Sequence, residues 1–260
     1  MAAIALIPAR WGSSRFPGKM LAPIAGRSLI LRTVENVLDM DLFQGVCVLT
    51  DDVRIAQHVM ESGIQVRMTS ASCPTGTDRL IEACLRYPEL LSADVIVNVQ
   101  GDEPCIRKRT LSQLLECLEE DPSSVMATPI TRLGPLEEVY DPSVVKCVVD
   151  ATGHALYFSR APIPFSTAAR GCLKERAFKH VGVYAYRREF LLRYGTLRRT
   201  PLQEMEDLEQ LKVIEHGYRI RTTVVEDPCL GVNTPEDIRG VEQFICNQNT
   251  SSSPAVSALV

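Results

Sequence analysis

The sequence has no paired-cysteine motif of the kind that builds disulfide frameworks or structural zinc sites. Its nine cysteines are an odd number, and they include no CxxC pair and no cluster with histidine. This pattern excludes a disulfide-rich secreted domain and a zinc finger. We therefore expect reduced thiols that pack as small apolar side chains in a cytoplasmic protein.

The chain also lacks an excess of positive charge and long apolar runs. It has 28 Lys and Arg against 32 Asp and Glu, a net charge of −4, which argues against a nucleic-acid binder. No stretch approaches the length of a membrane span. The apolar start MAAIALIPA has no basic segment before it, so we expect a first strand there rather than a signal peptide.

What the sequence does contain is the composition of an ordinary globular protein. Hydrophobic residues make up 45% and charged residues 23% of the 260 residues. A chain of this length buries a sizeable core, as one large domain or as one domain with a smaller annex.

Short apolar runs alternate with helical patterns through the first half of the chain. In the first helical pattern, Ile30, Val34, Val37 and Leu38 have the spacing of one helix face. The expected strands are 3–7, 45–50, 64–68 and 94–100, and the expected helices are 29–38, 55–60, 78–85 and the region around 111–118. Repeated β-α-β units predict an α/β fold with a doubly wound, mostly parallel sheet, which binds ligands at the C-terminal ends of its strands.

The pattern changes after about residue 125. Apolar runs at 144–149 and 154–158 flank a turn signal, which predicts two antiparallel strands, and 181–186 predicts a further strand. We therefore expect residues 130–190 to form a smaller antiparallel insertion, a candidate lid or dimer arm.

The C-terminal part has the signals of a helix, a strand and a final helix. Leu208, Leu211 and Ile214 predict the first helix, and a strand is expected at 220–225. Thr234, with Pro235 at the first helical position, predicts a last helix to about residue 246. Residues 247–260 are small and polar, so we expect a disordered tail.

The most informative stretch is the loop PARWGSSRFPGK, which runs from Pro8 to Lys19 directly after the first predicted strand. It places Arg10, Arg15 and Lys19 among small residues. Backbone N–H groups of such a loop can face an anion, and three cations can neutralise several phosphate charges. The loop therefore predicts a polyphosphate site.

The spacing within this loop excludes two common nucleotide-binding motifs. Five residues separate Gly12 and Gly18 rather than four, and Met20 stands where a Walker loop has Ser or Thr. No GxGxxG dinucleotide motif is present either. A solvated basic turn is the alternative, and the aromatic side chains of Trp11 and Phe16 argue against it.

A second candidate site follows the predicted strand VIVNVQGDEP, residues 95–104. Asp102 lies at its C-terminal edge, and magnesium sites on nucleotides often use only one or two carboxylates. Asp102 is therefore predicted to bind Mg²⁺, with a plain turn before Pro104 as the alternative. Thr50 and Asp51 are expected to cap the next helix instead. A cationic loop and a metal carboxylate on such a sheet predict nucleotidyl transfer.

Six blocks of the sequence together resemble the 3-deoxy-manno-octulosonate cytidylyltransferase family, the CMP-Kdo synthetases of Gram-negative bacteria. The blocks occur in the family's order from about residue 2 to 246: PARWGSSRFPGK, TGTDRL, VNVQGDEP, ALYFSRAPIP, KHVGVYAYR and EDLEQLK. The resemblance implies a nucleotide-diphospho-sugar transferase-like fold in one cytidylyltransferase domain, residues 1–246.

The resemblance implies transfer of CMP from CTP to 3-deoxy-manno-octulosonate (Kdo), with release of pyrophosphate, for lipopolysaccharide biosynthesis. It also implies Mg²⁺ as cofactor and a homodimer. Lys19, Asp102 and Arg10 match catalytic positions, and no side-chain base is expected. The positions that match nucleotide contacts are Arg10, Arg15, Lys19, Arg79 and Gln100.

The same resemblance implies a pocket for the acidic sugar. Such a sugar needs a cation for its carboxylate and mixed donors and acceptors for its hydroxyls. The matching positions are Gln100, Arg160, His180, Tyr184, Glu209 and Gln210. Without the resemblance, packing or a solvated surface would be the favoured explanation of these residues.

The chain departs from the family at one predicted metal ligand. The family usually reads GVDTPEDL where this chain reads GVNTPEDI, so Asn233 replaces the second metal carboxylate. An amide oxygen still coordinates a hard cation but attracts it less, which predicts an elevated magnesium requirement. Asp237 is expected to serve the first turn of the last helix.

Two rival functions follow from these observations. A cytidylyltransferase for sialic acid shares the fold and a related loop, but the block QGDEP argues against it. A non-catalytic nucleotide-sugar binding protein is the other, suggested by Asn233.

Overall fold

The sheet at the centre of the molecule joins a parallel half to an antiparallel half. The computed structural model describes residues 1–13, 15–134, 136–165, 177–227 and 230–251. Within them the main sheet has ten strands, in the order β5-β4-β1-β6-β11-β7-β10-β8-β9 with β12 paired to β7. The strands are β1 (Ala3–Ala9), β4 (Val46–Thr50), β5 (Val66–Met68), β6 (Val95–Asn98), β7 (Met126–Arg132), β8 (Lys146–Val149), β9 (Ala155–Ser159), β10 (Phe178–His180), β11 (Tyr184–Arg187) and β12 (Ile220–Val225).

The parallel half forms as its apolar runs predict. β1 lies between β4 and β6 and pairs with both in parallel, and β4 pairs with β5 in parallel. Side chains of β1 alternate between two apolar clusters, with Ala5 and Ile7 in one and Ile4 and Leu6 in the other. Both faces of this half are therefore covered, as a doubly wound sheet requires.

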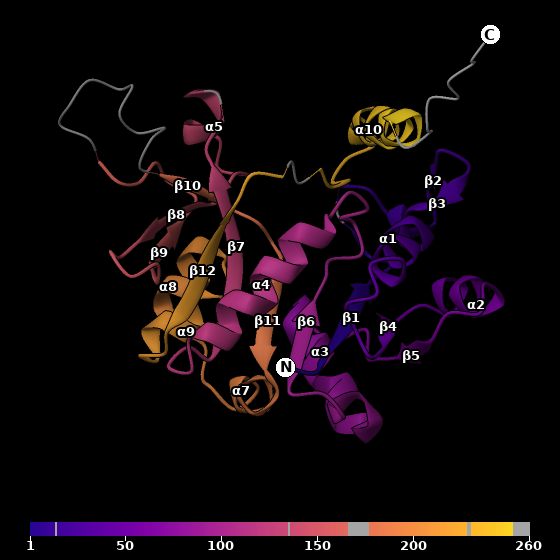
Figure 1. The fold of residues 1–260 in the computed structure, drawn as a ribbon. Coiled ribbons are helices and arrows are strands. Elements are labelled where there is room, and N and C mark those ends of the chain that lie inside the picture. Colours follow the sequence, from indigo (N-terminus) through magenta and orange to yellow (C-terminus); the bar gives the residue numbers. More distant parts are fainter. Residues whose placement is uncertain (14, 135, 166–176, 228–229, 252–260) are drawn as a thin grey trace, which may run out of the picture.

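Helices supply the two covering layers. The helices are α1 (Leu29–Leu38), α2 (Val53–Glu61), α3 (Gly76–Arg86), α4 (Lys108–Glu120), α5 (Leu136–Tyr140), α7 (Arg188–Tyr194), α8 (Pro201–Glu206), α9 (Leu211–Glu215) and α10 (Asp237–Ser251). Apolar residues of α1, α2 and α4 join the first cluster, and those of α3, α7 and α9 join the second. Figure 1 shows α4 over the middle of the sheet, where it contacts β12, β7 and β11.

The residues predicted as an antiparallel insertion continue the main sheet. β8 and β9 form the predicted hairpin, and β11 lies antiparallel between β6 and β7. β10 and β11 both pair with β7, first at 130–132 and then at 126–127. The chain bends between them at Val181–Val183, so that β10 continues to β8 and β11 to β6. Two predicted sugar-site residues lie on the two sides of this bend, His180 at the end of β10 and Tyr184 at the start of β11.

Two predictions near the C-terminus need correction. The last helix begins at Asp237 rather than at Pro235, because a turn with bonds from Asp237 N to Thr234 O and from Ile238 N to Pro235 O precedes it. The helix continues to Ser251, so residues 247–251 are not part of a disordered tail. The remainder of the predicted tail, 252–260, lies outside the described residues.

Most of the described cysteines are buried, as expected of small apolar side chains. None of the seven forms a disulfide with another described residue, and five of them are buried. Burial raises the pKa of the Cys84 thiol to about 12, which keeps it protonated. In the described part of the chain, no helix has the length and apolar character needed to cross a membrane.

Candidate active site

The loop after β1 folds around the side chain of Trp11. The Trp11 carbonyl accepts hydrogen bonds from Ser13 N at 3.0 Å and from Gly18 N at 3.1 Å. Gly18 has a φ of +72°, and a Cβ added there would lie 3.0 Å from the indole ring. The guanidinium of Arg54 stacks on the ring at 3.3 Å from its centroid. Trp11 therefore anchors the loop rather than standing in solvent, and glycine is required at position 18.

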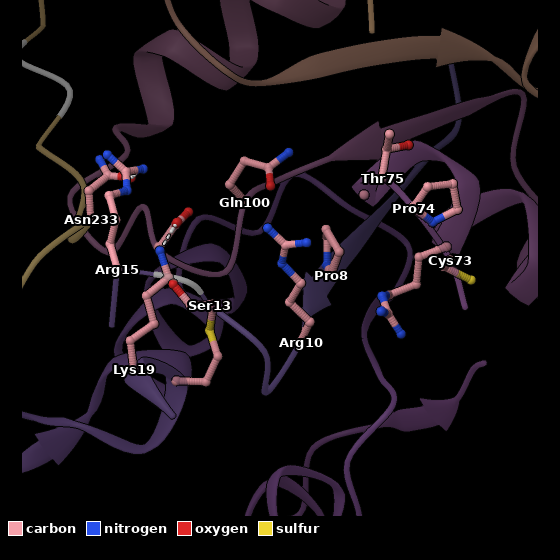
Figure 2. Close-up of a pocket in the computed structure, with 14 residues that line it drawn as sticks. Pro8, Arg10, Ser13, Arg15, Lys19, Cys73, Pro74, Thr75, Gln100 and Asn233 are labelled. Carbon is pink, nitrogen blue, oxygen red and sulfur yellow. Dashed lines mark hydrogen bonds and ion pairs between the residues drawn. The ribbon is translucent and has the colours of Figure 1, made fainter. Parts of the chain in front are cut away.

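A pocket of about 210 Å³ opens beside this loop, at the C-terminal ends of β1 and β6. Figure 2 shows Arg15, Lys19 and Asn233 together at one side, and Cys73, Pro74 and Thr75 at the other. The residues that line it are Pro8, Arg10, Ser13, Arg15, Lys19, Met20, Cys73, Pro74, Thr75, Gly76, Arg79, Gln100, Asp102 and Asn233. All predicted phosphate, nucleotide and metal residues are thus brought into one pocket.

The charge of this pocket is strongly positive. Four of its described lining residues are Arg or Lys, and Asp102 is the single carboxylate among them. The N-terminal end of α3 also borders it, since Thr75 is the N-cap and accepts a hydrogen bond from Asp78 N. Cations and a helix N-terminus both favour an anion, so the arrangement suits a polyphosphate.

Both predicted metal ligands are held by cations of the opening loop. The ammonium of Lys19 forms an ion pair with Asp102 and donates to Val232 O at 3.0 Å. Arg15 Nη2 donates to Asn233 Oδ1 at 3.0 Å. Lys19 is 7% exposed, so its charge acts on Asp102 with little screening by water.

Backbone contacts hold the segment around Asn233 against the end of β6. Val232 N donates to Asp102 O at 2.9 Å. Glu103 packs against Gly231, where a Cβ would lie 2.8 Å from its carboxylate. Burial, helped by the neighbouring charge of Asp102, raises the pKa of Glu103 to about 8. Asp237 accepts bonds from the backbone N–H of Asn233 and Thr234, which confirms its predicted place at the start of the last helix.

The capping roles predicted for Thr50 and Asp51 are partly wrong. Asp52 is the N-cap of α2, and its carboxylate accepts a hydrogen bond from Arg54 N at 2.9 Å. Asp51 does not cap the helix. Its carboxylate instead contacts Arg79 and the backbone of Trp11. The sequence shows two adjacent acids at a strand end, and only the tertiary contacts distinguish them.

The predicted sugar residues lie mostly behind this pocket rather than in it. Tyr184 Oη donates to Gln210 Oε1 at 3.1 Å, and the ring of His180 lies 5.4 Å from that of Tyr184. Glu209 accepts a hydrogen bond from Thr77 Oγ1 at 3.0 Å. Gln100 is the one member of this set that lines the first pocket.

A second pocket, of about 320 Å³, adjoins the first through the shared residue Thr75. Glu209 lines it together with Arg199, Gln203, Glu204, Asp207 and Leu208. At the first pocket the Gln100 amide donates to Asn98 Oδ1 at 3.3 Å. Buried polar atoms around the two pockets that have no hydrogen-bond partner among the described residues include Asn98 Nδ2, Gln203 Oε1, Glu209 Oε2 and Gln210 Nε2. Buried groups without partners mark a place for water or a ligand.

Arg160 contacts the backbone of the protein, which differs from its predicted role in binding the sugar. Its guanidinium donates to three backbone carbonyls, those of Pro142, Glu206 and Asp207. These bonds fix the end of β9 to α8. The structure therefore does not bring Arg160 together with His180 and Tyr184 around one cavity, and the cation that lines the second pocket is Arg199.

Sequence reasoning missed several residues that line the pockets, including Cys73, Arg199 and Gln203. Pro74 and Thr75 precede α3, whose first residue is Gly76, and a predicted helix N-terminus after a strand is a signal that could have drawn attention to them. No comparable signal exists for Arg199 and Gln203, which reach the pocket from the connection before α8 and from α8 itself.

The environment of His180 leads to a prediction about pH and stability. Burial lowers its pKa to about 3, whereas an unfolded histidine has a pKa of about 6.5. Below pH 6.5 the unfolded chain therefore binds one more proton than the folded chain, so stability falls as the pH decreases toward 3. Between pH 7 and 5 this residue alone should remove about 2 kcal/mol from the free energy of unfolding.

The measurement compares urea unfolding of the wild type and of His180→Gln at pH 7 and pH 5. The variant should lose about 2 kcal/mol less than the wild type over this interval. His216→Gln, at an exposed histidine, serves as the control and should follow the wild type. Equal pH dependence of the wild type and His180→Gln would contradict the assignment.

Comparison with known proteins gives a consistent result. A family model described as cytidylyltransferase matches residues 4–220. The 3-deoxy-manno-octulosonate cytidylyltransferase of Protochlamydia amoebophila is 50% identical over 249 residues, 95% of each chain. That of Geobacter metallireducens is 44% identical, with 90% of this chain and 94% of the relative covered.

Solved structures agree with these relatives. CMP:2-keto-3-deoxy-manno-octonic acid synthetase complexed with CTP is 39% identical and has a TM-score of 0.86, covering 95% of this chain and 100% of the other. A 4-diphosphocytidyl-2C-methyl-D-erythritol synthase from Anaerococcus prevotii has a TM-score of 0.64 at 12% identity, a likeness of fold alone.

Proposed function

The chain belongs to the 3-deoxy-manno-octulosonate cytidylyltransferase family, and on that premise we propose how its two pockets carry out the transfer of CMP from CTP to Kdo. The reaction forms CMP-Kdo and releases pyrophosphate. The observation that carries the proposal is the pocket in which four cations surround one carboxylate, at the C-terminal ends of β1 and β6.

The first pocket binds CTP in this proposal. Arg10, Arg15 and Lys19 hold the phosphates, because all three extend from one loop whose backbone is anchored on Trp11. Cys73, Pro74 and Thr75 form the opposite wall (Figure 2), which leaves the nucleoside on that side. Arg79 and Gln100 border the space between these two ends.

The donors of this pocket fit Mg²⁺, which we propose as the cofactor. Asp102 would supply a carboxylate oxygen and Asn233 an amide oxygen, and both are hard ligands on segments bonded to each other. Within the described residues no group of three or more His, Cys, Asp or Glu side chains is placed so that it could hold a metal ion by itself, so the nucleotide and water would complete the ligand set. Bound there, the ion would lower the pKa of the attacking sugar hydroxyl and offset phosphate charge.

Kdo binds in the second pocket, next to Thr75. Glu209 lines this pocket and offers an acceptor for its hydroxyls. The hydrogen-bonded pair of Tyr184 and Gln210 is buried and does not line it, so these two residues would contact the sugar only after a local rearrangement. Gln100, together with Asn98, lies between this pocket and the nucleotide. The anomeric hydroxyl then faces the α-phosphate, which suits in-line attack. Arg160 would contact the sugar only after it exchanges its backbone partners.

The chain's own residues contribute to the reaction mainly through charge and position. As the bond between the α- and β-phosphates breaks, negative charge accumulates on pyrophosphate. Lys19, Arg10 and Arg15 stabilise that charge, and preorganised cations in a partly enclosed site do so more effectively than water. No side chain is assigned as general base.

A direct assay tests the proposed function. The purified chain is incubated with CTP, MgCl₂ and either Kdo or sialic acid, and pyrophosphate release is followed. Rapid release with Kdo alone is the expected result. Release with sialic acid instead would overturn the sugar assignment, and CTP binding without release would indicate a binding protein.

The replacement of a carboxylate by Asn233 leads to a prediction about metal dependence. Asn233→Asp should lower the magnesium concentration for half-maximal activity about tenfold, because a second negative charge attracts the cation. Gln65→Glu is the control, since it adds the same charge at an exposed position away from the pocket. Magnesium curves that coincide for the wild type and Asn233→Asp would refute the role of residue 233.

We also propose a homodimer and a cytoplasmic location. β9 is an edge strand of the sheet in the described part of the chain, and Leu156 on it is 57% exposed, which gives the antiparallel half an apolar surface for a partner. Sedimentation analysis of the full chain would reveal the dimer.

A further inference from the structure

The carboxylate of Asp51 connects the two sides of the nucleotide pocket from behind. Asp51 follows β4, the strand that neighbours β1, and it is not among the residues that line the pocket. Its Oδ1 accepts a hydrogen bond from Trp11 N at 3.3 Å, and its Oδ2 accepts one from Arg79 Nη2 at 3.1 Å. Trp11 belongs to the cationic loop, whereas Arg79 belongs to α3, which continues from Thr75 of the opposite wall.

The contact with Arg79 lies in a largely buried environment. The side chain of Arg79 is 3% exposed and that of Asp51 is 13% exposed. The other arm of the guanidinium, Nη1, donates to Thr69 Oγ1. A buried guanidinium needs an anionic partner, and charge-assisted hydrogen bonds of this kind are the stronger ones. Asp51 therefore fixes where Arg79, and with it the first turns of α3, lies relative to the pocket.

The contact with Trp11 reaches the cationic loop at its anchor. The Trp11 carbonyl holds Ser13 and Gly18 through their backbone N–H groups, and Gly18 directly precedes Lys19. The indole ring packs against Gly18 and beneath Arg54. Holding the Trp11 backbone therefore holds the whole turn that presents Arg15 and Lys19.

A capping role does not explain Asp51. The helix that follows has its N-cap in Asp52, whose carboxylate accepts from Arg54 N and from the Arg54 guanidinium. The hydroxyl of Thr50 accepts from Asp52 N. The turn into α2 is thus completed by the neighbours of Asp51, and both Asp51 oxygens point to the two sides of the pocket.

We propose that Asp51 is a positioning residue that sets the spacing between the phosphate-binding loop and the nucleoside wall of the site. The proposal rests on the proposed binding of CTP in this pocket. Substitution of Asp51 should weaken the binding of ligands that contact both the loop and the wall. It should have little effect on the binding of ligands that contact the wall alone. CTP spans both sides, whereas CMP lacks the two terminal phosphates that reach Arg15 and Lys19.

The test measures CTP and CMP binding to Asp51→Asn by tryptophan fluorescence. Trp11 is the only tryptophan in the sequence, so its emission reports on the anchored loop directly. Asparagine still accepts from Trp11 N but lacks the charge that Arg79 requires. The Kd for CTP should rise about tenfold, as expected for one charge-assisted bond, while the Kd for CMP changes less than about threefold.

Two further variants complete the design. Glu89→Gln removes an exposed carboxylate–arginine pair, with Arg67, and should leave both dissociation constants unchanged. Asp51→Glu retains the charge but shifts it by one methylene, so it should restore the CTP affinity only in part. If Asp51→Asn does not fold, Asp51→Glu is measured in its place, and its remaining loss of affinity should be larger for CTP than for CMP.

An equal loss of CTP and CMP affinity would overturn the proposal, because it would mean a general structural role. Unchanged CTP affinity in a folded Asp51→Asn would overturn it as well. Failure of the proposed function is distinguished by the wild type itself. A wild type that binds CTP but releases no pyrophosphate with Kdo would contradict the proposed function. The changes in Kd for CTP and for CMP would still test the role of Asp51.

Discussion

Replacing Asp102 with asparagine should lower turnover about 10²- to 10³-fold, the range found when one preorganised group that stabilises transition-state charge is removed from an active site. Asp102 is the single carboxylate among the described residues that line the pocket. Asparagine has nearly the same shape, but it carries no charge for a divalent cation. With asparagine already at position 233, the variant would have no anionic ligand left in this pocket.

The effect should lie in turnover and not in folding. Asp102 is bonded to its surroundings through its backbone carbonyl, which accepts from Val232 N, and that contact survives the substitution. An asparagine oxygen can also accept from Lys19. We therefore expect the variant to fold, with the free energy of unfolding in urea lowered by about 1–3 kcal/mol because Lys19 loses its charged partner.

Asp94→Asn is the matched control for this experiment. Asp94 is exposed and directly precedes β6, at the end of the strand opposite to Asp102. Its substitution removes the same charge. Its turnover should equal that of the wild type. Near-normal pyrophosphate release by Asp102→Asn at saturating CTP would contradict the metal role of Asp102.

The part of the site that could be predicted from the sequence follows from the parallel strands. β1 and β6 are neighbours and run in the same direction, so the residues that follow them meet at one edge of the sheet. Arg10 follows β1 directly, and Asp102 lies in the turn after β6. Their convergence therefore required only the correct identification of two apolar runs and of the β-α-β pattern between them.

The position of Asn233 illustrates what the sequence cannot predict by pattern alone. Its segment reaches the pocket after β12, which pairs with β7 in the other half of the sheet. Periodicity indicates a strand at 220–225 but not its partner. Only the resemblance to the family linked Asn233 with Asp102, and the contacts of Val232 explain in physical terms how the segment is held there.

The sequence also could not predict the partners of side chains that can form several different hydrogen bonds or ion pairs. Arg160 could bind a sugar carboxylate or backbone carbonyls, and in the fold its donors contact the carbonyls. Asp51 and Asp52 have the same chemistry and adjacent places, yet one contacts Arg79 and the other caps α2. Such choices depend on neighbours that are far apart in sequence.

Removing the ammonium of Lys19 should have opposite effects on catalysis and on metal binding. Lys19→Ala is expected to lower kcat/KM for CTP about 10²- to 10³-fold, because a buried cation next to the leaving phosphates is lost. The same change frees Asp102 from its ion pair with Lys19. Calorimetric titration of the nucleotide-free protein with MgCl₂ should therefore detect tighter binding in the variant than in the wild type.

A lower kcat/KM for CTP together with a higher affinity for Mg²⁺ would distinguish a specific role of Lys19 from general damage to the site. A distorted pocket would bind both CTP and Mg²⁺ less well. Lys108→Ala, which removes an exposed lysine from α4, should change neither property. If Lys19→Ala bound the ion more weakly than the wild type, the ion pair could not be what restrains Asp102. If it bound more tightly, Lys19 would hold the carboxylate in the free protein and release it when triphosphate supplies another anion, so that CTP and the metal bind cooperatively.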